Sequence, residues 1–107
     1  MSVVRVVEPK GNLDSISANN LRQEILDLVD RGVKTILINL DSVVFMNSSG
    51  MGALVATLKA VKAKGGELAL CSLTDQVKII FELSRMERIF KIYSDRQEFE
   101  AKHKIKA

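Results

Sequence analysis

The sequence has little of several residue types on which enzymes and secreted proteins depend. Its 107 residues include one cysteine, one histidine, one proline and no tryptophan. A single cysteine, Cys71, cannot form an internal disulfide, which suits a reducing compartment. One cysteine and one histidine also cannot build an ordinary zinc site. We therefore expect a protein that uses neither a metal nor a cofactor and that has no disulfide framework.

Long apolar runs are absent as well. No stretch approaches the roughly 20 residues needed to cross a membrane, and the start of the chain, "MSVVRVVEPKG", does not resemble a signal peptide. Hydrophobic residues nevertheless make up 47% of the chain, which is enough for a real core. We expect a cytoplasmic protein of one domain over residues 1–107, with a core at about 3–100 and a frayed basic tail at 101–107.

The net charge of +3 is concentrated in the second half of the chain. The lysines gather at Lys59, Lys62 and Lys64 and in the tail at Lys102, Lys104 and Lys106. Such a cluster can contact nucleic acid or a membrane, or it can be a solvated helix face with a loose terminus. Aromatic residues for base stacking are only 5% of the chain, and nucleic-acid motifs are absent. We therefore expect no direct contact with nucleic acid or membrane.

Hydrophobic patterning predicts strands and helices in alternation. Short apolar or β-branched runs predict strands at residues 3–7, 35–40, 67–71 and 89–93. Helical spacing predicts a helix capped by Asp14 or Ser15, a second that carries Met51–Val61, and a third capped by Thr74 or Asp75. A last, peripheral helix is predicted by a capping box at Ser94 and Gln97, with a thin apolar face of Phe99 and Ala101. This order predicts an α/β fold, with a mostly parallel sheet of four to five strands covered by about four helices.

The motifs of the common enzyme classes do not fit this sequence. The histidine, His103, lies in the charged tail, and the pattern G-x-S-x-G of serine hydrolases is absent. A P-loop is missing, and Val55 occupies the third glycine position of a dinucleotide fingerprint. Asp41 ends a predicted strand like the acceptor of a receiver domain, but Glu8 stands alone where a receiver has paired acidic residues. We therefore predict no catalytic residue and no enzymatic activity.

The stretch "FMNSSGMGALV", residues 45–55, places two serines at the start of a predicted helix. Asn47 or Ser48 can cap that helix, since either side chain can accept a hydrogen bond from the first turn. One cap is sufficient, so Ser49 is left over near the positive end of the helix dipole, where a phosphate meets free N–H groups. Gly50 and Gly52 carry no side chain that would obstruct an approaching protein. The pattern suggests that Ser49 is phosphorylated.

Several segments together resemble a known family. The segments "GNLD" at 11–14, "TILINLDSVVFMNSSGMGALV" at 35–55 and "KAKGGELALC" at 62–71 resemble the STAS domain of bacterial anti-sigma-factor antagonists. The resemblance extends from about Val3 to Phe99. Its most specific block is the family's Asp-Ser-Ser-Gly-Leu-Gly, which here reads Asn47-Ser48-Ser49-Gly50-Met51-Gly52.

The resemblance implies a phosphorylation switch. It makes Ser49 the phosphoacceptor and implies that the unphosphorylated protein binds an anti-sigma factor that is also its serine kinase, which frees the sigma factor. Phosphorylation then ends the binding, and a PP2C-type phosphatase resets the protein. The partner surface implied by the family consists of Asp14, Asn47, Ser48, Ser49, Gly50, Met51 and Gly52.

One departure from the family and one alternative function accompany this hypothesis. Asn47 stands where the family usually has an aspartate, so the cap is kept while a negative charge beside Ser49 is lost. The alternative function is a STAS scaffold or binding subunit of a signalling or lipid-transport complex, in which Ser49 is not phosphorylated.

Overall fold

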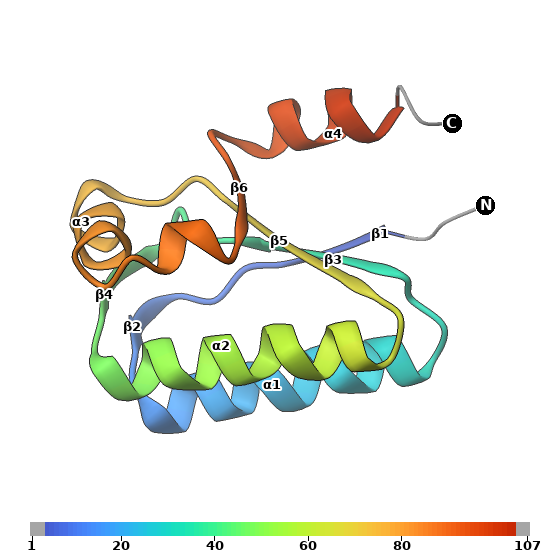
Figure 1. The fold of residues 1–107 in the computed structure, drawn as a ribbon, viewed down its shortest axis with the longest axis horizontal. Coiled ribbons are helices and arrows are strands. Elements are labelled where there is room, and N and C mark those ends of the chain that lie inside the picture. Colours follow the sequence, from blue (N-terminus) through green and yellow to red (C-terminus); the bar gives the residue numbers. More distant parts are fainter. Residues whose placement is uncertain (1–3, 105–107) are drawn as a thin grey trace.

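The computed structural model describes residues 4–104 and confirms the α/β fold (Figure 1). One parallel sheet has the strand order β1 (Val4–Val7), β3 (Thr35–Asn39), β5 (Glu67–Cys71) and β6 (Lys91–Tyr93). A second, two-stranded parallel sheet pairs β2 (Gly11–Leu13) with β4 (Val43–Met46). The helices are α1 (Ser15–Asp30), α2 (Ser48–Ala63), α3 (Asp75–Leu83) and α4 (Arg96–Lys104), with a short 3₁₀ turn, η1 (Met86–Arg88), before β6.

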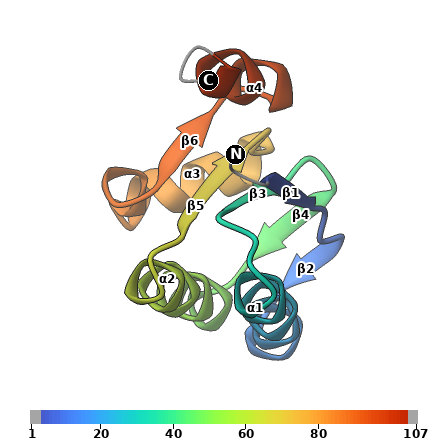
Figure 2. The same cartoon turned by 90° about the vertical axis from the view of Figure 1, so that its right-hand side faces the viewer.

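Helices cover both faces of the larger sheet. Figure 2 shows α1 and α2 side by side below the sheet and α4 above it. The lower core joins Ile36 and Ile38 of β3 to helix residues such as Ile25 and Leu58, and the upper core joins Leu37 to Phe99. Successive residues of a strand point to opposite faces, so both faces of β3 are buried. This explains why the segment "TILIN" is apolar almost throughout.

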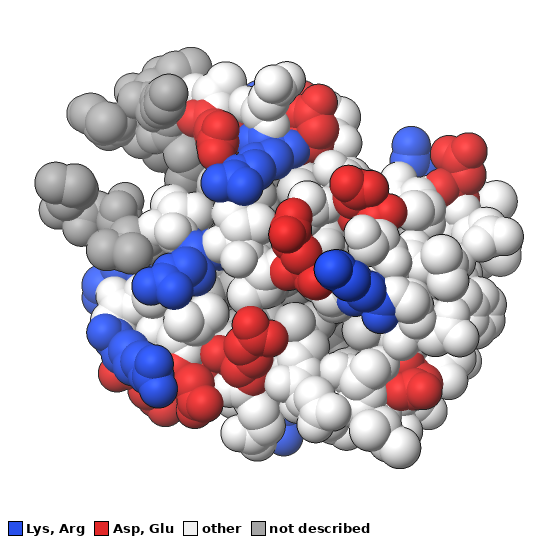
Figure 3. Space-filling view, turned by 180° about the vertical axis from the view of Figure 1, so that it is seen from behind, with Lys and Arg blue, Asp and Glu red and all other residues white. Residues whose placement is uncertain are grey.

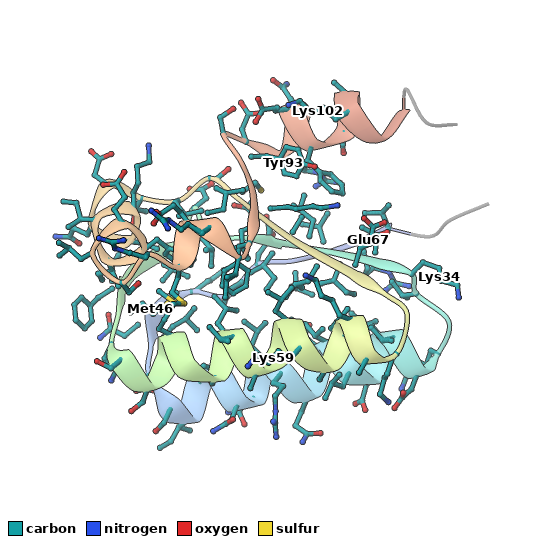
Figure 4. The ribbon with its side chains drawn as sticks, in the orientation of Figure 1. Lys34, Met46, Lys59, Glu67, Tyr93 and Lys102 are labelled. Atoms are coloured by element: carbon teal, nitrogen blue, oxygen red, sulfur yellow. The ribbon has the colours of Figure 1, made fainter. Side chains whose placement is uncertain are left out.

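The C-terminal helix differs in part from its prediction. Phe99 is buried and packs edge-to-face on Tyr93, with ring centroids 5.3 Å apart, but Ala101 is exposed. The ammonium group of Lys102 lies over the ring of Tyr93, 5.8 Å from its centroid (Figure 4). The basic tail, expected to fray from residue 101, is helical as far as Lys104, and residues 105–107 lie outside the described part of the chain.

The side-chain cap of α4 lies one residue later than predicted. The Glu98 N–H donates to the carboxylate of Asp95 at 2.8 Å, and the Glu98 side chain accepts from the Ser94 N–H at 2.7 Å. The predicted box of Ser94 and Gln97 is therefore wrong. A carboxylate is a stronger acceptor than a hydroxyl at the positive end of a helix, which favours Asp95.

The strand predicted at 89–93 is shorter in the structure. Residues 86–88 form the 3₁₀ turn, and Phe90 packs edge-to-face on Phe81 with ring centroids 5.7 Å apart. Only residues 91–93 pair with β5. Among the described residues, no helix combines the length and the hydropathy needed to cross a membrane.

Candidate functional site

The candidate site lies where the two strands of the small sheet end and two helices begin. Leu13 of β2 pairs with Met46 of β4, and each strand leads directly into a helix cap. The Asn47 N–H donates to the Leu13 carbonyl at 3.2 Å, which joins the two strand ends. The N-termini of α1 and α2 are therefore neighbours, and neither helix has an acidic residue in its first turn. Two adjacent positive helix ends favour a negative charge at this point.

Asn47 caps α2 and leaves both serines free. Its side-chain oxygen accepts from the Gly50 N–H at 2.7 Å, which resolves the choice between Asn47 and Ser48 that the sequence left open. Ser48 and Ser49 are the first two residues of the helix, and both are exposed. Within residues 4–104, no protein group is hydrogen-bonded to either hydroxyl or to either of their N–H groups.

Gly50 is buried, so the expectation that it opens the surface is wrong. A Cβ added at Gly50 would lie 2.0 Å from the Leu13 carbonyl oxygen and 2.7 Å from its carbon. The missing side chain therefore lets α2 start close to β2. Gly52, in contrast, is exposed, and apart from its chain neighbours and its own helix backbone no atom lies within 4 Å of the position of its missing Cβ.

Of the seven residues in the implied partner surface, two lie below it. Met51 is only 7% exposed and belongs to the core with Leu54, and Gly50 is enclosed as described above. Neither residue can present a side chain to a partner in this fold. The members of the set that face solvent are Asp14, Asn47, Ser48, Ser49 and Gly52.

Asp14 is the cap of α1 as well as an exposed member of the site. Its carboxylate accepts from the Ser17 N–H at 2.9 Å, and the Ser17 hydroxyl accepts from the Asp14 N–H at 3.0 Å. Hydrogen bonds from the backbone and side chain of Ser17 lower the pKa of Asp14 below its ordinary value of 3.8. The carboxylate is therefore ionised at neutral pH. The sequence allowed Asp14 or Ser15 as the cap but gave no role to Ser17.

The site presents two exposed hydroxyl groups, those of Ser48 and Ser49. Among the described residues, no group of three or more His, Cys, Asp or Glu side chains could hold a metal ion. The one thiol, Cys71, is fully buried in the upper core, and burial raises its pKa, so it is a poor nucleophile.

Sequence reasoning did not identify the two strands that build this site. β2 and β4 have three and four residues, and each contains exposed positions. As a result, the exposed side chains of Val44 and Phe45 were not considered as part of a surface. The bond from the Thr74 hydroxyl to the Val43 carbonyl, 3.0 Å long, which joins α3 to β4, was also not foreseen.

Comparisons with known proteins agree with this architecture. The anti-sigma F factor antagonist of Paenibacillus polymyxa is 29% identical over 93 residues, covering 86% of this chain and 80% of the relative. The crystal structure of TM1081 from Thermotoga maritima superposes with a TM-score of 0.81 at 27% identity, covering 97% of this chain and 88% of that one. The structure of the antagonist SpoIIAA in its unphosphorylated form has a TM-score of 0.74 at 23% identity, over 99% and 90% of the chains, and shares the fold.

The family model of the STAS domain matches residues 2–99, which is nearly the whole chain. This match includes both strand–helix units that form the candidate site. The protein belongs to the STAS domain family.

Proposed function

We propose that this protein is an anti-sigma-factor antagonist controlled by phosphorylation of Ser49. The unphosphorylated form binds an anti-sigma factor that is also a serine kinase, and this binding releases the sigma factor. The observation that carries the proposal is the exposed, unpaired hydroxyl of Ser49 at a helix N-terminus that Asn47 already caps. The relative in Paenibacillus polymyxa, named as an anti-sigma F factor antagonist, supports the same role.

The chain acts as the substrate of phosphoryl transfer and not as its catalyst. The kinase transfers the γ-phosphoryl group of its ATP to Ser49 Oγ, the hydroxyl proton passes to a base of the kinase, and ADP is released. A PP2C-type phosphatase hydrolyses the phosphoserine and returns the protein to its binding form. The circuit operates in the cytoplasm and affects transcription through the anti-sigma factor, without direct contact between this protein and DNA.

A phosphate on Ser49 is compatible with the fold. The N–H groups of Ser48 and Ser49 have no protein acceptor within the described residues, so phosphate oxygens can take them. A negative charge at a helix N-terminus is favourable by about 0.3–1 kcal/mol. We therefore expect the phosphorylated protein to keep its structure.

The same phosphate opposes a partner that covers the site. It carries about −1.5 to −2 charges, and an unpaired charge buried in an interface costs about 3–5 kcal/mol. Every 1.4 kcal/mol is roughly a tenfold change in affinity. One phosphate on Ser49 is therefore sufficient to release the partner without any change of fold.

The proposal is tested with the serine-kinase anti-sigma factors of the source organism. With ATP, one phosphate should be added to the wild-type protein and to Ser48→Ala, and none to Ser49→Ala, as measured by intact mass and phosphopeptide sequencing. In titration calorimetry, Ser49→Ala should bind as the wild type does, and Ser49→Asp should bind at least tenfold more weakly. Equal affinity for all three forms would favour a scaffold without a switch, and phosphate found on Ser48 would refute the assignment to Ser49.

A further inference from the structure

Exposed apolar side chains gather at the end of the molecule that carries the Ser49 site. Seven large hydrophobic side chains are exposed among the described residues, and six of them come from the start of α1, from β4, or from α3 and the turn after it. These six are Ile16, Val44, Phe45, Ile79, Leu83 and Ile89. Figure 1 shows β4, α3 and the start of α2 together at the end opposite the chain termini. In Figure 3, much of that half of the surface has no charged side chain.

Helix α3 is apolar on two faces. Val77 and Phe81 point into the core and are fully buried. Ile79 and Leu83, four residues apart and therefore on one side of the helix, are 53% and 81% exposed. A second apolar stripe is typical of a helix that another element or another protein covers on that side as well.

Strand β4 also carries both buried and exposed apolar side chains. Val43 and Met46 are buried, and Met46 points inward (Figure 4). The two residues between them, Val44 and Phe45, are 54% and 49% exposed. Contiguous exposed apolar surface on a soluble domain marks an interaction site.

This apolar surface borders the Ser49 site directly. Phe45 precedes the cap residue Asn47 by two positions and pairs across the small sheet with Asn12, close to Asp14. The Thr74 hydroxyl holds the start of α3 against β4 through its bond to the Val43 carbonyl. The start of α3 therefore lies against β4, the strand that leads into the Ser49 site.

The surface around Ser49 itself has little to offer for affinity. Its exposed members are small or polar, such as Asn47, Ser48 and Gly52. A stable interface buries about 800 Å² on each partner, and most of its binding energy comes from a few anchors that are largely aromatic or packed in apolar pockets. A kinase that recognises this protein needs such an anchor next to the acceptor serine.

We propose that the face formed by Val44, Phe45, Ile79 and Leu83, here called the apolar face, is the docking surface for the anti-sigma factor kinase. This inference rests on the proposed function. It assigns binding affinity to one surface and control by phosphorylation to another. The apolar face provides affinity in both phosphorylation states, whereas Ser49 provides the switch. We expect the partner to carry a complementary apolar patch.

The test separates docking from phosphoryl transfer. Phe45→Ser and Leu83→Ser remove apolar area without touching the acceptor, and Val4→Ser removes an exposed apolar side chain from β1, away from the site. In steady-state phosphorylation, the first two variants should raise the KM for this protein at least tenfold and leave kcat within twofold. Val4→Ser should behave as the wild type. Combined with Ser49→Ala, the same two substitutions should weaken binding by the same factor in calorimetry.

The experiments distinguish a wrong docking surface from a wrong proposed function. A wild-type protein that no kinase binds or phosphorylates would refute both. The docking surface alone would be refuted if the wild-type protein is phosphorylated and Phe45→Ser and Leu83→Ser have the same KM as the wild type. Thermal melting must show that both variants are folded. Sedimentation velocity tests whether a second copy of the chain occupies the apolar face. If the wild type is a dimer, and these substitutions abolish the dimer without changing KM, the face belongs to the dimer and the proposal is overturned.

Discussion

A methyl group added to α2 should have opposite effects at two glycines that are only two residues apart. In Gly50→Ala the new Cβ would stand 2.0 Å from the Leu13 carbonyl oxygen, a contact that real structures do not tolerate. In Gly52→Ala the new Cβ would meet nothing within 4 Å beyond its chain neighbours and its own helix backbone. Both residues are in the helix and neither has a positive φ, so helix propensity favours alanine at both positions.

The magnitudes follow from these contacts. Replacing glycine by alanine in a helix stabilises a protein by about 0.5–1 kcal/mol, and this is the whole effect expected for Gly52→Ala. At Gly50 the obstacle is backbone, and the Leu13 carbonyl is also held by the Asn47 N–H at 3.2 Å. Overpacking costs about 1–3 kcal/mol, and a clash with fixed backbone belongs at the upper end. We expect Gly50→Ala to lose a net of about 2 kcal/mol, or roughly 8 °C in Tm.

Urea unfolding with a common slope m measures both variants against the wild type. Gly52→Ala serves as the matched control, because it has the same chemical change and nearly the same propensity term. The expected order of stability is Gly52→Ala, then wild type, then Gly50→Ala. If Gly50→Ala is as stable as Gly52→Ala, the close approach of α2 to β2 is wrong, and so is the account of why Gly50 is a glycine.

Four other substitutions, at three residues, test the caps and the upper core. Asn47→Ala should lose about 1 kcal/mol of unfolding free energy, and Asn47→Asp should lose none in urea unfolding, because only the first removes the acceptor for the Gly50 N–H. Phe99→Ala should cost about 3–5 kcal/mol in the same assay, because Phe99 fills the upper core. The pKa of Asp14 is lowered in the folded state, so its stabilising effect should be complete at neutral pH and vanish as the pH falls through that pKa, below 3.8. The stability difference between wild type and Asp14→Asn should then be constant above about pH 5 and move in favour of the variant in more acidic urea titrations.

The main elements of the fold could be predicted because their signals are local. The strand at 67–71 is bounded as predicted, since Gly65 and Gly66 separate it from α2 and its buried side chains are contiguous. The first three helices begin at predicted caps, among them Asp14 and Thr74. The small sheet had no such signal. β2 and β4 are short and partly exposed, and their stability comes from pairing with each other across about 30 residues of chain.

The site could be predicted only as far as local chemistry determines it. The capping argument left Ser49 as the spare hydroxyl, and the structure leaves both Ser48 and Ser49 exposed in the first turn. The choice between Asn47 and Ser48 depends on which residue has extended backbone, and Asn47 has it, with ψ of 177°. The role of Gly50 depends on the approach of β2, which is a tertiary contact that no local pattern contains.

The neutral cap at Asn47 affects how this site can hold a phosphate. Asn47 uses its side-chain oxygen for the Gly50 N–H and leaves the N–H groups of Ser48 and Ser49 to other acceptors. An aspartate at this position would make the same cap but would place a second negative charge within the same helical turn, where like charges disfavour each other. The ionised Asp14 at the neighbouring helix end already adds one such charge to the site. The amide of Asn47 therefore keeps the cap while reducing the repulsion that a phosphate on Ser49 would meet.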